Sequence, residues 1–290
     1  MRPTSLSCQE TSSQQKNDMV PLFSSLDATS WDDDDVRHRA RTIIETYIRA
    51  HRKTSRAWDL LLNVTQIGVL WDMARFTTTQ RLKMNDHGPI HAQVTAASAL
   101  TILDLLCSSG IEPDITKHGG DVDDATLIVL LTALCHDIGN AIHRIDHLSH
   151  SMMLAQPILD TILPVIYPDP HTTMLIKTFI LSAIHSHHGD PRPLTIEGSI
   201  ISVADAADMT KGRASHSTDI TTASMHAISA LAIDDVIITR GLNRPVEIQI
   251  VMSQLAGMFQ VHETLIPKIN AGLLKEYINV YIPLQDQYIY

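Results

Sequence analysis

The stretch ATLIVLLTALCHD, residues 125–137, joins an almost wholly apolar segment to an adjacent histidine and aspartate. Such a segment is typical of a helix that is buried on most of its sides. An aspartate is almost never fully buried without a partner, because removing its charge from water is costly. Asp137 therefore requires either a paired group or a metal ion beside it.

Two further side chains with metal-ligand chemistry bracket this pair, His91 before it and Asp205 after it. His91 stands at the start of an apolar stripe that predicts a helix, and Asp205 lies inside another apolar helical segment. The plain alternatives are a capping or core histidine at position 91 and a helix cap at position 205. Imidazole and carboxylate ligands together suit a borderline divalent metal, so the four side chains form a candidate metal site.

The order His91, His136, Asp137, Asp205 resembles the HD superfamily of metal-dependent phosphohydrolases, which is named for the adjacent pair. The resemblance covers roughly residues 80–285. Within the superfamily, this region is similar to an archaeal and bacterial branch of HD-domain hydrolases. It rests on NDHGPIHAQV (85–94), LCHDIGNAIHRIDHLSHS (134–151), AIHSHHGDPRPLTIEGSIISVADAADMTKGR (183–213) and IQIVMSQLAGMFQV (248–261). Many HD enzymes have lysine three residues after the aspartate, where this chain has Asn140, so no phosphate contact is transferred to that position.

The chain is rich in histidine, with 16 in total, and two groups lie between the pair and Asp205. His143 and His147 are four residues apart and would share one helix face if the helix continues. His187 lies in the second group, between His185 and His188. The resemblance implies that His147 and His187 hold a second ion, with the aspartate of the pair bridging both ions. The alternative is a single ion with these histidines free.

Mixed histidine and carboxylate ligation favours manganese, iron, cobalt, nickel or zinc over magnesium. Handling of a phosphate also requires positive charge near the metal, because the phosphate oxygens carry negative charge during attack. Arg144, Lys211 and Arg213 flank the ligand segments and are the candidate phosphate contacts. Each has a plain alternative as an exposed basic residue on a helix. Asp208 is a candidate for orienting an imidazole.

Composition limits the class of protein. The 290 residues carry a formal charge of −10 without a compensating basic stripe, which disfavours nucleic acid as a partner. The N-terminus lacks the apolar centre of a signal peptide, and no uninterrupted apolar run is long enough to span a membrane. The three cysteines follow no pattern, which fits a reducing compartment. We therefore expect a cytoplasmic protein that has no contact with membranes.

The order of apolar, polar and turn-forming segments along the chain predicts a mainly α protein with three parts. Residues 1–30 form a disordered or loosely attached arm, residues 31–215 a helical HD domain, and residues 216–290 a small α/β subdomain. An exposed strand edge in the last part would allow a homodimer. We predict a helix after the acidic run 32–35, helices over 56–73, 89–107, 127–139, 148–162, 173–186, 198–209 and 254–277, and strands over 234–241, 244–252 and 278–284.

These features together predict a phosphohydrolase that uses one or two divalent transition-metal ions to activate water against a phosphate ester. The substrate is a small phosphorylated molecule, either a nucleotide or another phosphomonoester or diester. Asp137 is the central residue of this hypothesis, as a ligand and in catalysis. Two alternatives remain open: a non-catalytic nucleotide-sensing or interaction module, and a di-iron oxygenase on the same scaffold.

Overall fold

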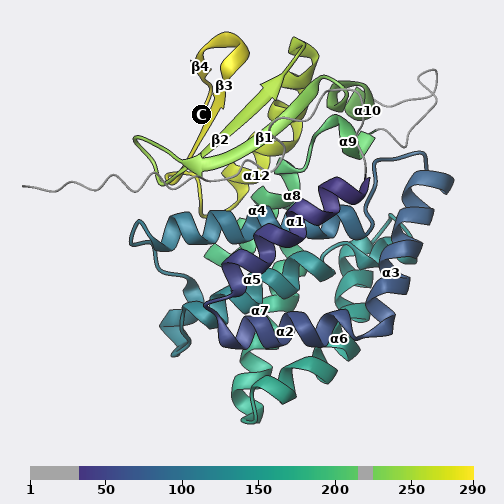
Figure 1. Ribbon diagram of the computed structural model, residues 1–290, viewed down its shortest axis with the longest axis vertical. Helices are drawn as coiled ribbons and strands as arrows, with labels where there is room; N and C mark the ends of the chain where they lie inside the picture. Colours follow the sequence, from purple (N-terminus) through teal and green to yellow (C-terminus); the bar gives the residue numbers. More distant parts are fainter. Residues whose placement is uncertain (1–32, 215–224) are drawn as a thin grey trace, which may run out of the picture.

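The computed structural model describes residues 33–214 and 225–290, so the predicted N-terminal arm lies outside the described residues. A body of helices carries a small sheet at one end, formed by the C-terminal part of the chain (Figure 1). The predicted fold class, a helical core with a small C-terminal α/β appendage, is confirmed.

The helical body begins with α1 and ends with the short α9, before the segment that is not described. Its helices are α1 (Asp33–Ile48), α2 (Arg52–Leu62), α3 (Thr65–Arg75), α4 (Pro89–Cys107), α5 (Val122–Cys135), α6 (His147–Ile166), α7 (Pro170–Ser186), α8 (Ile196–Ala207) and α9 (Lys211–Ala214). Single turns of 3-10 helix at Asp114–His118 and Ile138–Ala141 and a π-helical turn at Phe76–Arg81 connect them.

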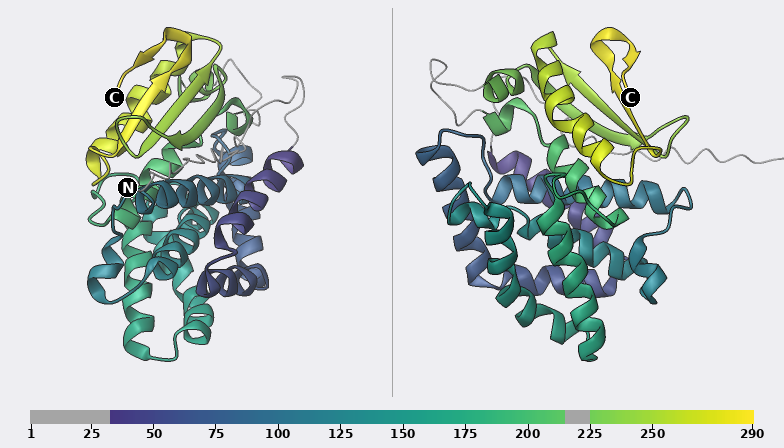
Figure 2. Two further views of the ribbon diagram at one scale, coloured as in Figure 1. Left: turned by 60° about the vertical axis from the view of Figure 1, so that its left-hand side comes forward. Right: turned by 180° about the vertical axis from the view of Figure 1, so that it is seen from behind.

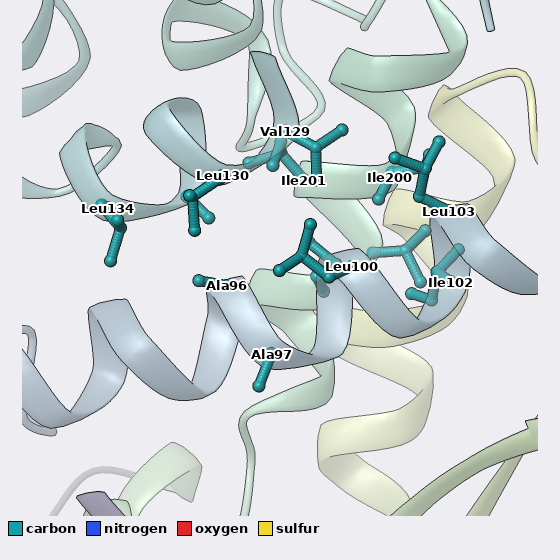
Figure 3. Packing of buried hydrophobic residues seen from close by; sticks show 14 of the residues in the cluster. Ala96, Ala97, Leu100, Ile102, Leu103, Val129, Leu130, Leu134, Ile200 and Ile201 are labelled. Carbon is teal, nitrogen blue, oxygen red and sulfur yellow. The ribbon is translucent and has the colours of Figure 1, made fainter. Parts of the chain in front are cut away.

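Three helices, α4, α5 and α8, form the centre of this body. Each packs against the other two, and almost every residue of α5 and α8 is buried. Figure 3 shows Leu100 of α4, Val129 of α5 and Ile200 of α8 meeting in the core. α4 is long and apolar enough to cross a membrane by length and composition, but 83% of that window is buried inside the protein. Burial against α5 and α8 accounts for its composition.

Polar side chains fix where the central helices begin. Asp121 accepts a hydrogen bond from the Asp124 amide while the Asp124 carboxylate accepts one from the Asp121 amide, which forms a capping box at the start of α5. Thr195 caps α8 by accepting from the Gly198 amide. These caps set the register of the helices and hence the place of the polar residues near their other ends.

Two helix predictions were wrong in their extent. The predicted helix over 56–73 is divided into α2 and α3, because Asn63 donates its side-chain amide to the Asp59 carbonyl and Val64 is extended. The predicted helix over 127–139 ends at Cys135. There the indole of Trp71 donates to the Leu134 carbonyl at 2.9 Å. A side chain from α3 therefore provides the hydrogen bond to a carbonyl in the last turn of α5.

The C-terminal sheet has the order β1-β2-β3-β4. The strands predicted over 234–241 and 244–252 are present as β1 (Ile233–Arg240) and β2 (Val246–Met252), which pair in antiparallel fashion. β3 (Ile278–Ile282) pairs with β2 in parallel, and β4 (Gln287–Tyr288) pairs with β3 in antiparallel fashion. The short helix α10 (Met225–Ala230) precedes this sheet.

The predicted helix over 254–277 is instead a broken crossover between β2 and β3, which lies on one face of the sheet (Figure 2). It contains turns at Leu255–Gly257 and Val261–Leu265, α11 (Met258–Gln260) and α12 (Ile266–Ala271). α12 packs against α8 and ends just before Gly272, where a side chain would overlap Ser199. One hydrophobic core continues from the helices into the strands, so α12 is held firmly beside α8.

Asp235, buried in β1, provides a test of this packing. Burial raises the pKa of its carboxyl to about 6, so the folded protein favours the neutral form. The protonated Asp235 carboxyl contributes fully to the stability of the fold below the pKa that it has in the unfolded chain. This contribution is lost as pH rises through 6. We expect Asp235→Asn to raise the melting temperature at pH 8, with a gain that shrinks as pH falls toward 4. Scanning calorimetry measures this.

The control for this experiment is Asp59→Asn on the exposed surface of α2. Its carboxylate faces water, so this variant should show no comparable growth of the difference between pH 4 and pH 8. A gain for Asp235→Asn that is independent of pH would contradict the assignment of a buried carboxylate to β1.

Candidate metal centre

The structure brings His91, His136, Asp137 and Asp205 together: one ligand atom of each lies within 4.8 Å of those of the other three. His91 Nε2 lies 3.1 Å from His136 Nε2 and 3.3 Å from Asp137 Oδ2. The distance from His91 Nε2 to Asp205 Oδ1 is 3.2 Å. All four side chains are buried. We refer to these four residues as the first ligand group.

Helix packing explains this convergence. His91 occupies the first turn of α4, the pair directly follows α5, and Asp205 lies in the last turn of α8. Because α4, α5 and α8 pack against one another, these three helix ends meet. The pair itself lies past the helix end, since His136 is the last residue with helical geometry and Asp137 has left it.

The second ligand group is His147, His187 and His188, whose ligand atoms also lie within 4.8 Å of one another. His147 opens α6, and His187 and His188 follow α7. His143 and His147 would share a helix face only in a continuous helix, and the structure has no continuous helix there. A turn with Asp146 in the left-handed region separates them, and His143 is exposed and accepts from the Ile145 amide.

The Asp137 carboxylate lies between the two groups and faces one with each oxygen. Oδ2 is 3.4 Å from His136 Nε2, in the first group. Oδ1 is 3.4 Å from His147 Nε2 and 3.6 Å from His187 Nε2, in the second group. Asn140 donates its side-chain amide to Oδ1 at 2.9 Å and thereby fixes the orientation of the carboxylate. One carboxylate is therefore in position to serve both groups.

Four imidazoles share one orientation: Nδ1 contacts an acceptor and Nε2 points toward Asp137. A backbone carbonyl or carboxylate only accepts, so the ring proton of a neutral imidazole resides on Nδ1 and leaves the Nε2 lone pair for a cation. The partners of Nδ1 are Asp208 Oδ2 for His91 (2.6 Å), Ala133 O for His136 (2.7 Å), Arg144 O for His147 (3.0 Å) and Ile184 O for His187 (2.7 Å).

Two consequences of this orientation fit a metal ion. The Nε2 atoms of His91 and His136 face each other at 3.1 Å, which requires a cation or a proton between them. His187 Nε2 is fully buried and has no hydrogen-bond partner among the described residues, which is costly for a polar atom unless an ion occupies the site. The donor set therefore fits one or two divalent ions.

The electrostatics of the two groups differ. Burial alone would raise the pKa of Asp137 and Asp205, but neighbouring cationic groups hold both pKa values well below the usual range. In the first group, burial and Arg213 oppose the nearby carboxylates, which raise the pKa of His91 to about 10. In the second group, burial lowers the pKa of His147 to about 4. Burial also lowers the pKa of His187 and His188, so the second group is uncharged near neutral pH.

Basic side chains surround both groups. Arg144 Nη1 lies 3.2 Å from His147 Nε2 and 3.9 Å from Asp137 Oδ1. Arg213 Nη2 lies 3.3 Å from His91 Nε2. Lys211, in contrast, donates to Asp234 Oδ1 at 2.7 Å, which is a partner outside both ligand groups.

Sequence reasoning missed Lys268 of α12, which donates to Asp205 Oδ2. It also assigned no role to His87, whose Nε2 lies 4.0 Å from Asp137 Oδ2. His87 lies in the stretch 85–94, which carries the family resemblance, so the sequence offered a signal for this residue. Lys268 lies in a segment expected to be an ordinary helix, and no pattern there marked it.

Comparisons with known proteins agree with this geometry. The family model for the HD domain matches residues 111–210, which include the adjacent pair and Asp205. A protein of Methanocaldococcus jannaschii named "Uncharacterized protein MJ1020" is 36% identical over 231 residues, covering 79% of this chain and 89% of the relative. This chain belongs to the HD-domain superfamily. The HD-domain family is generally of the metal-dependent phosphohydrolase type. No solved structure matches it significantly.

Gly139 tests how tightly the HD pair is held against α6. A Cβ at this position would collide with the His147 carbonyl oxygen and the Ser151 amide, and the Gly139 amide donates to Ser151 Oγ at 2.9 Å. We expect Gly139→Ala to destabilise the protein by at least ~1–3 kcal/mol, because backbone atoms have to move apart. Urea unfolding measures the change.

The matched control is Gly68→Ala in α3, where a Cβ would meet nothing within 4 Å. That variant should be more stable by about 0.4–1 kcal/mol, since alanine restricts the unfolded chain. Equal effects of the two substitutions would show that α6 does not press against the pair as described.

Proposed function

We propose that this HD-domain protein is a phosphohydrolase that cleaves a small phosphate ester with the help of one or two divalent transition-metal ions. The observation that carries the proposal is the placement of the buried Asp137 carboxylate between two groups of imidazoles, with arginines beside each group. Burial of this many metal-ligand atoms is difficult to explain by packing alone.

The chain's residues suggest where the ions bind. The first group would hold one ion through His91, His136, Asp137 and Asp205. The second would hold another through Asp137, His147 and His187. When bound, such ions lower the pKa of a coordinated water and neutralise phosphate charge. The donor set favours manganese, iron, cobalt, nickel or zinc.

The protein contributes orientation and positive charge. The hydrogen bonds to the Nδ1 atoms keep the imidazoles aimed at Asp137, which keeps the ligand atoms in place before substrate arrives. Arg144 and Arg213 lie at the two groups and would donate to the nonbridging phosphate oxygens, whose negative charge they offset. Lys211, paired with Asp234, would act at the rim rather than at the reacting phosphate.

Substitution of Asp137 tests the proposal. Asp137→Asn keeps the shape of the side chain but removes the charge that both ligand groups face. We expect the metal affinity to fall by more than the ~100-fold typical of an outer-sphere partner, and phosphate release to be lost. The measurement is elemental analysis of the purified protein, followed by phosphate release from phosphomonoesters, phosphodiesters and nucleotides in manganese, iron, cobalt, nickel and zinc.

Asp146→Asn is the matched control, because Asp146 is exposed and asparagine tolerates its left-handed backbone. This variant should retain metal and activity. Full activity in metal-free protein would contradict the proposal. Tight nucleotide binding without turnover in any metal would favour a sensor, and oxygen uptake without phosphate release would favour a di-iron oxygenase.

A further inference from the structure

Lys268 belongs to the C-terminal crossover, yet its side chain reaches the first ligand group. Its ammonium contacts Asp205 Oδ2, and its side chain is only 11% exposed. The docking of α12 explains this position: Leu273, just past the helix, donates its amide to Ser199 Oγ of α8 at 3.0 Å. Asp205 lies further along α8, in its last turn, where Lys268 contacts it.

The two oxygens of Asp205 have different partners. Oδ1 faces His91 Nε2 at 3.2 Å, inside the first ligand group. Oδ2 faces Lys268. An ammonium has three N–H donors, and the other two of Lys268 have no acceptor among residues 33–214 and 225–290. A largely buried ammonium with two further N–H donors, beside a candidate metal site, is suited to bind an anion.

Lys268 also lies on the side of the site that Arg144 reaches. Arg144 Nη2 lies 3.4 Å from His188 Nε2. A Cβ at Gly189, the residue after His188, would lie 3.9 Å from Lys268 Cγ, so the stem of the lysine passes beside this turn. Arg144, from the turn before α6, and Lys268, from α12, therefore both lie beside the segment that contains His188 and Gly189.

The charges of the site favour a doubly charged ligand. The carboxylates of Asp137, Asp205 and Asp208 are matched by the cations of Arg144, Arg213 and Lys268. Binding of any divalent ion then makes the site positive. A terminal phosphoryl group carries about −1.5 to −2 charges near neutral pH, whereas the phosphate of a diester carries only one. The charge balance therefore favours a terminal phosphoryl group.

We propose that Lys268 is a substrate-binding residue, which donates to an oxygen of a terminal phosphoryl group, so that the C-terminal segment completes the HD site and selects monoesters over diesters. The selection of monoesters rests on the proposed function. The binding of phosphate by Lys268 does not, because inorganic phosphate presents the same doubly charged group without any reaction.

The test is calorimetric titration of inorganic phosphate into the metal-loaded full chain. Lys268→Met keeps the buried stem and removes the charge, and we expect phosphate affinity to fall about 10-fold to 100-fold, as for loss of a hydrogen bond to a charged group. The metal content per chain should stay unchanged. Lys268→Arg should restore most of the affinity.

Lys275→Met is the matched control, since Lys275 is exposed and lies shortly after α12. It should bind phosphate like the natural chain. Three results would overturn the inference: a natural chain that does not bind phosphate, a Lys268→Met variant that binds it equally well, and a Lys268→Met variant that has lost its metal. The last result would show that the lysine only positions Asp205.

Activity separates this inference from the proposed function. If the natural chain binds phosphate through Lys268 but hydrolyses no phosphate ester, the proposed function fails and the binding role stands. If it hydrolyses esters, Lys268→Met should reduce kcat/KM for p-nitrophenyl phosphate more than for bis-p-nitrophenyl phosphate. Equal reductions for both would overturn the selection of monoesters.

Discussion

The burial of the Asp137 carboxylate is the constraint on which the rest of the structure depends. A charged carboxylate remains inside a protein only where neighbouring groups replace the water it has lost. Here the replacement comes from the Asn140 amide, from Arg144 and from imidazoles on several helices. The packing of α4, α5 and α8 and the convergence of the ligand atoms therefore depend on each other. A shift of α4, for example, would move His91 away from the Asp137 carboxylate, which lies 3.3 Å from its Nε2.

Patterns within short stretches of sequence predicted those parts of the site that depend on nearby residues alone. The apolar run before His136 predicted a buried helix, and the burial of that helix implied a partner for Asp137. The end of this helix could not be predicted, because it depends on the indole of Trp71, which is 63 residues away in the chain from its acceptor Leu134. Because α5 ends at Cys135, Asp137 lies past the helix and faces both ligand groups.

The C-terminal segment shows the same limit. Enrichment in β-branched residues predicted the two strands that the structure contains as β1 and β2. The parallel pairing of β2 with β3 and the resulting position of α12 on α8 arise from long-range packing. Lys268 and Lys275 look alike in the sequence, yet only Lys268 contacts Asp205. The appendage is thus in contact with the candidate metal centre, although its sequence gives no sign of metal chemistry.

The most direct test of the central claim is anomalous X-ray diffraction from crystals of the metal-loaded protein, at the absorption edge of the metal identified by elemental analysis. The structure predicts a peak enclosed by the Nε2 atoms of His91 and His136 and the carboxylates of Asp137 and Asp205, with any second peak on the side of Asp137 that faces His147 and His187. A metal-replete, active protein whose only anomalous peaks lie away from Asp137 would contradict the account.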